Sequence, residues 1–183
     1  MNGVDLHTHS NISDGSHSPE MLVRAAVEKG IHTLALTDHD SMDGLNLDEK
    51  TAVEFPIKII SGVEISSQWS RPSTKKTYGV HIIALNIQDL EPLQQVLRQQ
   101  QKTRAARAIE ICQLLQSCTG LDLYADVVAK VDGIADRITR THIAQTLVEH
   151  GVVKRAQQAF DAYLKEGKKA YVKFEGIGLA DTL

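Results

Sequence analysis

Strand-like and helix-like segments alternate over the first part of this 183-residue chain, and this alternation limits the possible folds more than any other feature. A helix is expected to begin at Ser18 and end at Gly30, because serine caps first turns, Pro19 suits the first helical position and glycine ends helices. Strand-like apolar runs occupy residues 3–8, 33–37, 57–63 and 80–85. Strands that alternate with helices predict an α/β fold with a mostly parallel sheet.

The second part of the chain has a helical periodicity instead, with no strand pattern. Apolar residues at helical spacing cover residues 89–119, 141–150 and 153–166. Four strands are few for a closed parallel barrel, so the α/β domain is expected to be incomplete. We therefore divide the chain into an N-terminal α/β part (1–86), an inserted helical subdomain (87–169) and a return toward the α/β part (170–183).

Composition and charge exclude several classes of function. Lys and Arg number 20 and Asp and Glu 23, so a net charge of −3 gives no overall positive field for duplex DNA. Aromatic residues make up 4% of the chain, which argues against a base-stacking platform. The N-terminus has no signal-peptide pattern, and no apolar run reaches transmembrane length. We expect a soluble cytoplasmic protein with no membrane partner.

The positions of the eight histidines matter more than their number. His7 and His9 are two residues apart, so on a strand both imidazoles face the same way and could share a metal ion. Taken alone, they could equally be exposed polar residues on an edge strand. Asp14 follows in an Asp-Gly pair, which by itself is typical of an ordinary turn.

The same residue types recur at each later strand. His39 follows the second strand and is flanked by Asp38 and Asp40, while Glu64 ends the third strand and His81 lies in the fourth. Individually, Glu64 could be a solvated charge and His81 a buried core histidine. A parallel sheet brings the ends of its strands together, so the joint placement of these residues predicts one metal site.

Five segments together resemble the polymerase and histidinol phosphatase (PHP) family of metal-dependent phosphoesterases. They are residues 5–10 (DLHTHS), 13–15 (SDG), 37–40 (TDHD), 62–66 (GVEIS) and 80–85 (VHIIAL). The chain is most similar to the branch with a helical insertion that acts as a 3′,5′-nucleoside bisphosphate phosphatase and 5′→3′ exoribonuclease. Within the helical part, residues 140–142 (RTH) and 167–172 (GKKAYV) also resemble that branch.

The resemblance implies a distorted (β/α)7 barrel that holds up to three metal ions, most often Mn²⁺ and sometimes Fe²⁺ or Zn²⁺. It assigns His7 and His9 to one ion, Asp14 and His39 to a second, and Glu64 as a bridge to a third that His81 also holds. Asp38 and Asp40 are expected to assist catalysis by orienting these ligands. The family's later His-Pro-Gly and Asp-x-His ligand motifs are absent, so we expect a truncated barrel whose open edge favours self-association.

Cations are needed near the metals to select a phosphorylated substrate. Arg137 and Arg140 are three residues apart and would share a helix face, and arginine suits bidentate phosphate binding. Lys168 could reach a second phosphate, although each of these residues could equally form a surface salt bridge. A basic stretch at near-helical spacing is expected to be a solvated helix face, with an RNA track as the alternative; it comprises Arg98, Lys102, Arg104 and Arg107.

The sequence thus predicts a metal-dependent phosphoesterase that acts on a nucleoside 3′,5′-bisphosphate, on the 5′ end of short RNA, or on both. One alternative is a phosphatase for another small monoester, such as histidinol phosphate. Another is a truncated PHP module that binds metal but has no activity.

Overall fold

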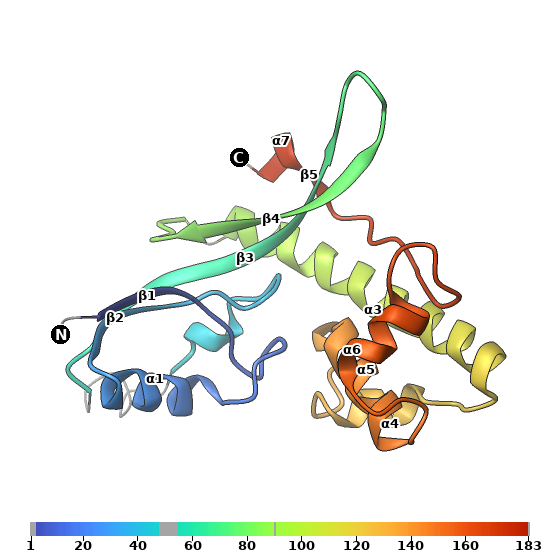
Figure 1. Cartoon of the computed structure of the whole chain (residues 1–183). Coiled ribbons are helices and arrows are strands. Elements are labelled where there is room, and N and C mark those ends of the chain that lie inside the picture. The colour runs from blue at the N-terminus through green and yellow to red at the C-terminus, as the bar shows by residue number, and fades with distance from the viewer. Residues whose placement is uncertain (1–2, 48–54, 90, 183) are drawn as a thin grey trace. The chain divides into compact units, whose positions relative to one another are not determined.

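The computed structural model describes residues 3–47, 55–89 and 91–182, which form two compact units (Figure 1). The α/β unit comprises the described residues of 1–100 and 176–183, and the helical unit comprises residues 101–175. The boundary between them lies inside one long helix, α3 (Glu91–Thr119), whereas the sequence pattern placed it before that helix.

The α/β unit is built on a five-stranded sheet with the order β1-β2-β3-β4, and β5 pairs with β3. The strands are β1 (Gly3–Thr8), β2 (Ile31–Leu36), β3 (Lys58–Ser70), β4 (Thr77–Leu85) and β5 (Ile177–Gly178). The α/β class is confirmed, and β1, β2 and β3 pair in parallel as predicted. Within the described residues the sheet is open, with β1 and β4 at the two ends of its strand order and β5 paired only with β3.

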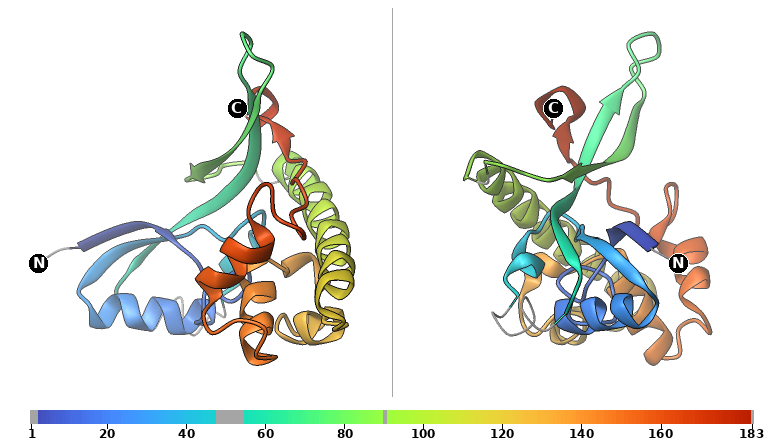
Figure 2. Two further views of the ribbon diagram at one scale, coloured as in Figure 1. Left: turned by 45° about the vertical axis from the view of Figure 1, so that its right-hand side comes forward. Right: turned by 90° about the vertical axis from the view of Figure 1, so that its left-hand side faces the viewer.

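The fourth strand is the exception to the expected parallel sheet, because β4 runs antiparallel to β3 along its length. Only residues 71–76 connect the two strands. A parallel pair needs a crossover of a dozen or more residues, so this short connection can only form a hairpin. Figure 2 shows the outer part of this hairpin projecting beyond the rest of the sheet.

Helix α1 (Pro19–Glu28) covers one face of β1 and β2, as Figures 1 and 2 show. Its first turn is capped as predicted, since the Ser18 hydroxyl accepts a hydrogen bond from the Met21 amide. Val23 and Ala26 are buried in a cluster with Leu34 and Leu36 of β2. This packing fixes the strand that leads to residues 37–40. A short 3₁₀ helix, η1 (Asp43–Leu45), follows that segment.

Strand β3 continues well past its predicted end at residue 63. Residues 66–70 (SSQWS) lack apolar alternation, so no strand was predicted there. Ser66 is nevertheless buried. Its amide donates to the Asp40 carboxylate over 2.7 Å, and its carbonyl accepts from the Gln100 side chain. Antiparallel pairing with β4, from Ser66 opposite His81 to Ser70 opposite Thr77, extends the strand.

The helical unit has its own core. Besides α3 it contains α4 (Tyr124–Ala129), η2 (Ala135–Arg137), α5 (Arg140–Glu149), α6 (Ala156–Ala159) and the π-helical turn η3 (Phe160–Leu164). The predicted helix over 153–166 is thus shorter and divided, with Gln158 accepting the Lys154 amide ahead of its first turn. Helix α4 was missed because six residues are too few to show a helical period.

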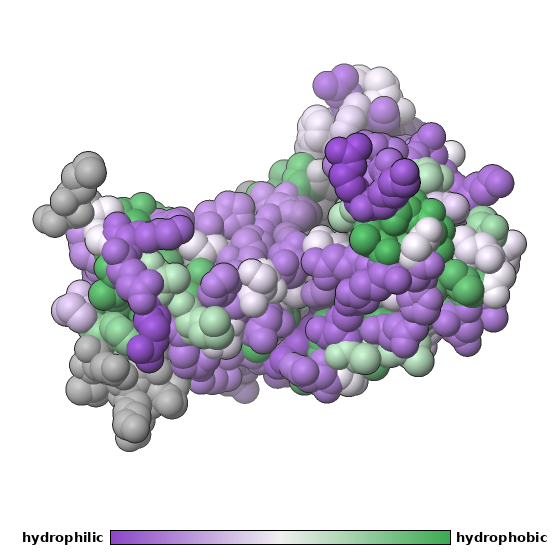
Figure 3. Space-filling view, turned by 60° about the horizontal axis from the view of Figure 1, so that its bottom comes forward, coloured by the Kyte–Doolittle hydropathy of each residue, from purple (hydrophilic) through white to green (hydrophobic). Residues whose placement is uncertain are grey.

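Helix α7 (Leu179–Thr182) follows β5 in the α/β unit. Polar side chains cover most of the face drawn in Figure 3, with apolar side chains interspersed. Among the described helices, none is both long enough and apolar enough to cross a bilayer.

Replacing Leu115, which is fully buried in the core of the helical unit, should destabilise that unit. We expect Leu115→Ala to lower the free energy of unfolding by about 3 kcal/mol, because lost burial and the resulting cavity both contribute. Urea denaturation followed by far-ultraviolet circular dichroism measures this change. Ile109→Ala on the same helix is the matched control; since Ile109 is 40% exposed, an equal loss there would contradict the assignment.

Candidate metal centre

Six potential metal ligands converge in the α/β unit. They form three overlapping groups whose donor atoms lie within 4.8 Å of one another: His7, His9 and Glu64; His9, Asp14 and His39; and His39, Glu64 and His81. The structure therefore brings together all six residues that the sequence selected. Their role as ligands stays a prediction.

Strand β1 determines the direction in which the side chains of His7 and His9 point. Side chains alternate along a strand, so His7 in β1 and His9 just after it point to the same side. Their Nε2 atoms lie 3.1 Å apart, and their ring centroids are separated by 5.1 Å. Two imidazole nitrogens at this spacing are directed at a common point.

Glu64 is the centre of the cluster. Its Oε2 atom lies 3.1 Å from Nε2 of His7, 3.0 Å from Nε2 of His9 and 3.5 Å from Nδ1 of His39. Its Oε1 atom contacts Nδ1 of His81 across the β3–β4 hairpin. One buried carboxylate therefore contacts all four imidazoles.

The backbone of β3 holds His39 beside Glu64. The two residues form a parallel bridge, in which the Asp40 amide donates to the Glu64 carbonyl over 2.9 Å and the Glu64 amide donates to the Asp38 carbonyl over 3.2 Å. Asp40 adopts a left-handed conformation with φ of 51°. The segment that follows β2 is thereby attached to β3 along its length.

The buried Asp38 carboxylate anchors the loop that carries Asp14. It accepts hydrogen bonds from the Ser10 amide and hydroxyl, over 2.8 and 2.7 Å, and from the Ser13 hydroxyl over 2.6 Å. Gly15 permits this tight turn, since a Cβ atom there would lie 2.1 Å from the His9 carbonyl oxygen. Asp38 thus holds the loop in place, while its expected role in catalysis stays a prediction.

The anchored loop places Asp14 between two histidines. Its Oδ1 atom lies 3.2 Å from Nδ1 of His9, and its Oδ2 atom lies 3.8 Å from Nε2 of His39. The sequence analysis missed Ser10 and Ser13 as positioning residues. Their only signal was a pair of hydroxyl side chains around a turn, and such pairs are common in loops.

The charges in the cluster are strongly coupled. Burial opposes ionisation of Glu64, but hydrogen bonds from His81 and His9 hold its pKa far below the ordinary range. Hydrogen bonds to Asp14 and Glu64 raise the pKa of His9 to about 9, against the effect of burial. In the metal-free protein His9 therefore carries a proton at neutral pH, which an incoming metal ion must displace.

The donor set fits transition-metal ions. Imidazole together with carboxylate suits Mn, Fe or Zn better than Ca, and three overlapping groups offer places for more than one ion. Within the described residues, the Glu64 side chain is 7% exposed, whereas the side chains of His7 and His81 are 54% and 52% exposed. A solute can therefore reach the cluster from the side of these two histidines.

The PHP domain family matches residues 5–175. The chain belongs to this family. Among curated PHP relatives, a 5′-3′ exoribonuclease from Haemophilus influenzae is 41% identical over 93% of this chain and 60% of its own length. A 3′,5′-nucleoside bisphosphate phosphatase from Chromobacterium violaceum is 33% identical over 100% of this chain and 62% of its own length. The chain thus spans about three-fifths of these relatives.

Two solved structures share the fold. An amidohydrolase from Chromobacterium violaceum, described with bound sulfate and no metal, aligns with a TM-score of 0.87 at 33% identity, covering 98% of this chain and 61% of that one. A protein from Bifidobacterium adolescentis, assigned as a metal-dependent phosphoesterase, aligns with a TM-score of 0.84 at 26% identity, covering 97% and 60%. The resemblance inferred from the five sequence segments is confirmed.

The basic residues selected from the sequence lie in the helical part of the chain. Arg137 ends η2, Arg140 begins α5, and Lys168 is exposed. Their contact with a substrate stays a prediction. The expectation of a solvated basic face on α3 is wrong in part, because Arg104 and Arg107 are partly buried against the ring of Phe174.

The stability of the metal-free PHP domain should fall as pH rises from 6.5 to 9. A histidine whose pKa is raised in the folded state contributes stability that is complete below its unfolded pKa of 6.5 and is lost as pH passes its folded value of about 9. We expect the melting temperature in EDTA to drop over this window. The melting temperature of the His9→Gln variant should change less with pH than that of the unchanged chain. Equal changes in the two proteins would contradict a stabilising contact of protonated His9 with Asp14 and Glu64.

Proposed function

We propose that this PHP chain carries the metal centre of a phosphoesterase that removes the 3′-phosphate from nucleoside 3′,5′-bisphosphates, or degrades short RNA from its 5′ end, or does both. The observation that carries the proposal is the set of three overlapping ligand groups around Glu64. The names of the relatives from Haemophilus influenzae and Chromobacterium violaceum support the substrate class. We propose Mn²⁺ as the first metal to test, before Fe²⁺ and Zn²⁺. We also propose that the protein is located in the cytoplasm.

Different residues of the chain would bind the metal ions and hold the ligands in position. Bound divalent ions would supply positive charge that lowers the pKa of water and offsets the charge of the phosphoryl oxygens. Glu64 and the histidines around it would hold those ions close together, and Asp14 would complete the group beside His9 and His39. Asp38 would keep Asp14 in place through the loop, so that little rearrangement is needed on binding.

Recognition of the substrate is proposed for the basic residues of the helical part. Arg140 and Lys168 lie in the segments that resemble the nucleotidase branch, and Arg137 would share a helix face with Arg140; the cationic side chains of all three suit phosphate groups. The preference for a nucleotide over another small phosphate monoester rests on these residues. A PHP module that binds metal but lacks activity is the competing function.

Phosphate release from adenosine 3′,5′-bisphosphate tests the proposal. We expect the purified chain to release phosphate when Mn²⁺ is present and to release none in EDTA. Glu64→Gln should lower the rate by at least about 100-fold, because removing one of the ligands weakens the charge stabilisation that the ions provide. Glu28→Gln makes the same chemical change at an exposed position on α1 and should leave the rate unchanged.

The outcomes separate the competing functions. Release of phosphate from histidinol phosphate but not from the bisphosphate would favour the other monoester phosphatase. Stable Mn²⁺ binding without release from either compound would favour the inactive metal-binding module. A rate in Glu64→Gln equal to that of the unchanged chain would contradict a role for this cluster in the reaction.

A further inference from the structure

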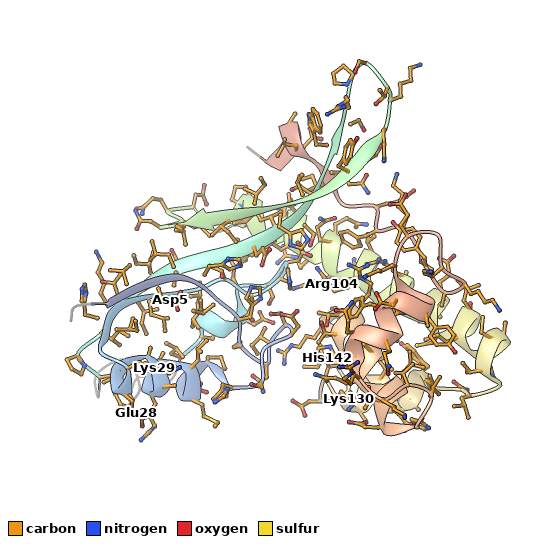
Figure 4. All side chains as sticks on the ribbon, viewed as in Figure 1. Asp5, Glu28, Lys29, Arg104, Lys130 and His142 are labelled. Carbon is orange, nitrogen blue, oxygen red and sulfur yellow. The ribbon has the colours of Figure 1, made fainter. Side chains whose placement is uncertain are left out.

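The outer end of the β3–β4 hairpin, where side chains extend outward in Figure 4, carries aromatic and basic residues. We call residues 69–78 (WSRPSTKKTY) the hairpin tip; this segment contains no acidic residue. Trp69 is the single tryptophan of the chain, is 38% exposed and lies opposite Tyr78 on the neighbouring strand. The three cations of the tip are all exposed; they are Arg71, Lys75 and Lys76. The hairpin tip therefore presents positive charge and an aromatic ring at one place.

Backbone hydrogen bonds gather the cations on a defined turn. The Arg71 amide donates to the Lys76 carbonyl over 2.8 Å, and the Lys75 amide donates to the Arg71 carbonyl over 2.8 Å. Within the described part of the chain, none of these three cations forms an ion pair with a carboxylate. Their charges are therefore available to an anionic partner from solution.

The aromatic pair is stacked beside these cations. The ring centroids of Trp69 and Tyr78 are 5.9 Å apart, with an interplanar angle of 30°. The Tyr78 centroid also lies 5.9 Å from the guanidinium carbon of Arg71 and 5.3 Å from Nζ of Lys76. A cross-strand aromatic pair stabilises a hairpin, and lysines at a strand edge prevent edge-to-edge pairing. Neither role requires the exposed indole surface that Trp69 retains beside the cations.

We infer that the hairpin tip binds single-stranded RNA, with one base stacked on Trp69 and the backbone phosphates beside the three cations. Proteins that bind single strands combine positive charge along the backbone with aromatic rings on which bases stack. A duplex hides the faces of its bases, and an acidic peptide has no base to stack. The low aromatic content of the chain excludes an extended stacking platform but allows the stacking of one base. The choice of RNA rests on the proposed function, whereas the binding itself needs no metal ion.

The hairpin tip is a surface separate from the candidate metal centre. Trp69 follows Glu64 by five positions in β3, which is about 17 Å along an extended strand. Because side chains alternate along a strand, the two residues also face opposite sides of β3. Binding of RNA at the tip can therefore be measured without occupying the metal centre.

The fluorescence of Trp69 tests this inference, because this residue is the single tryptophan of the chain. The full chain is titrated in EDTA with a decamer of oligoadenylate RNA. We expect the decamer to quench the fluorescence, since a base stacked on the indole ring is an efficient quencher. Adenosine 5′-monophosphate at the same nucleotide concentration should quench much less, because it offers a single phosphate to the cations. Added salt should weaken the binding of the decamer.

Variants of the tip locate the binding, measured by the fluorescence anisotropy of end-labelled decamer. Trp69→Ala should weaken binding at least about fivefold, and Trp69→Phe, which keeps an aromatic ring, should bind more tightly than Trp69→Ala. Lys76→Gln should weaken binding about threefold and lower the salt dependence by about one phosphate contact. It also serves as the test if circular dichroism shows that Trp69→Ala does not fold. Lys29→Gln, at an exposed lysine of the same unit labelled in Figure 4, is the matched control and should bind as the unchanged chain does.

Several results would overturn the inference. They are binding of the decamer without quenching of Trp69, the absence of any binding, full binding in both Trp69→Ala and Lys76→Gln, and an equal loss in Lys29→Gln. Competition by polyglutamate as strong as by unlabelled RNA would instead identify an acidic protein segment as the partner. Because the assay contains no metal ion and measures binding alone, its failure would leave the proposed phosphoesterase activity standing, and failure of the phosphatase assay would leave RNA binding at the tip standing.

Discussion

The candidate metal centre depends on one buried carboxylate, Glu64, which contacts four imidazoles from three neighbouring parts of the sheet. Burial alone would favour its neutral form, but hydrogen bonds from His81, His9 and His7 and the charge of His39 lower its pKa and keep it ionised. The same carboxylate keeps a proton on His9, whose pKa is raised to about 9. Metal binding would exchange that proton for a larger charge at the same place.

The backbone makes this convergence possible. Parallel pairing of β2 with β3 brings residues 38–40 beside Glu64, and the antiparallel hairpin brings His81 of β4 to its other side. Asp38 and Asp40 then use their carboxylates to secure the loop before Asp14 and the backbone of β3. Rigid elements thus support the residues expected to bind metal, which limits the reorganisation needed on binding.

Much of this centre could be predicted because five of its six residues, all but Asp14, lie in strands or just beyond them, where apolar runs mark the boundaries. The direction of β4 could not be read from its apolar pattern, since parallel and antiparallel strands share it; only the short connection reveals it. The positioning role of Ser10 and Ser13 could not be predicted either, because hydroxyl side chains are common in turns and do not indicate a particular partner. Arg107 looked like a surface residue because helical spacing does not show that Phe174, far along the chain, covers it.

The metal content of the purified chain, measured by plasma mass spectrometry after dialysis against Mn²⁺, tests the central claim most directly. Because two of the three overlapping ligand groups contain Glu64, the unchanged chain should retain two or more ions, and Glu64→Gln should lose at least one of them. A chain that retains no ion, or a Glu64→Gln variant that retains the same number as the unchanged chain, would contradict a metal centre organised around Glu64.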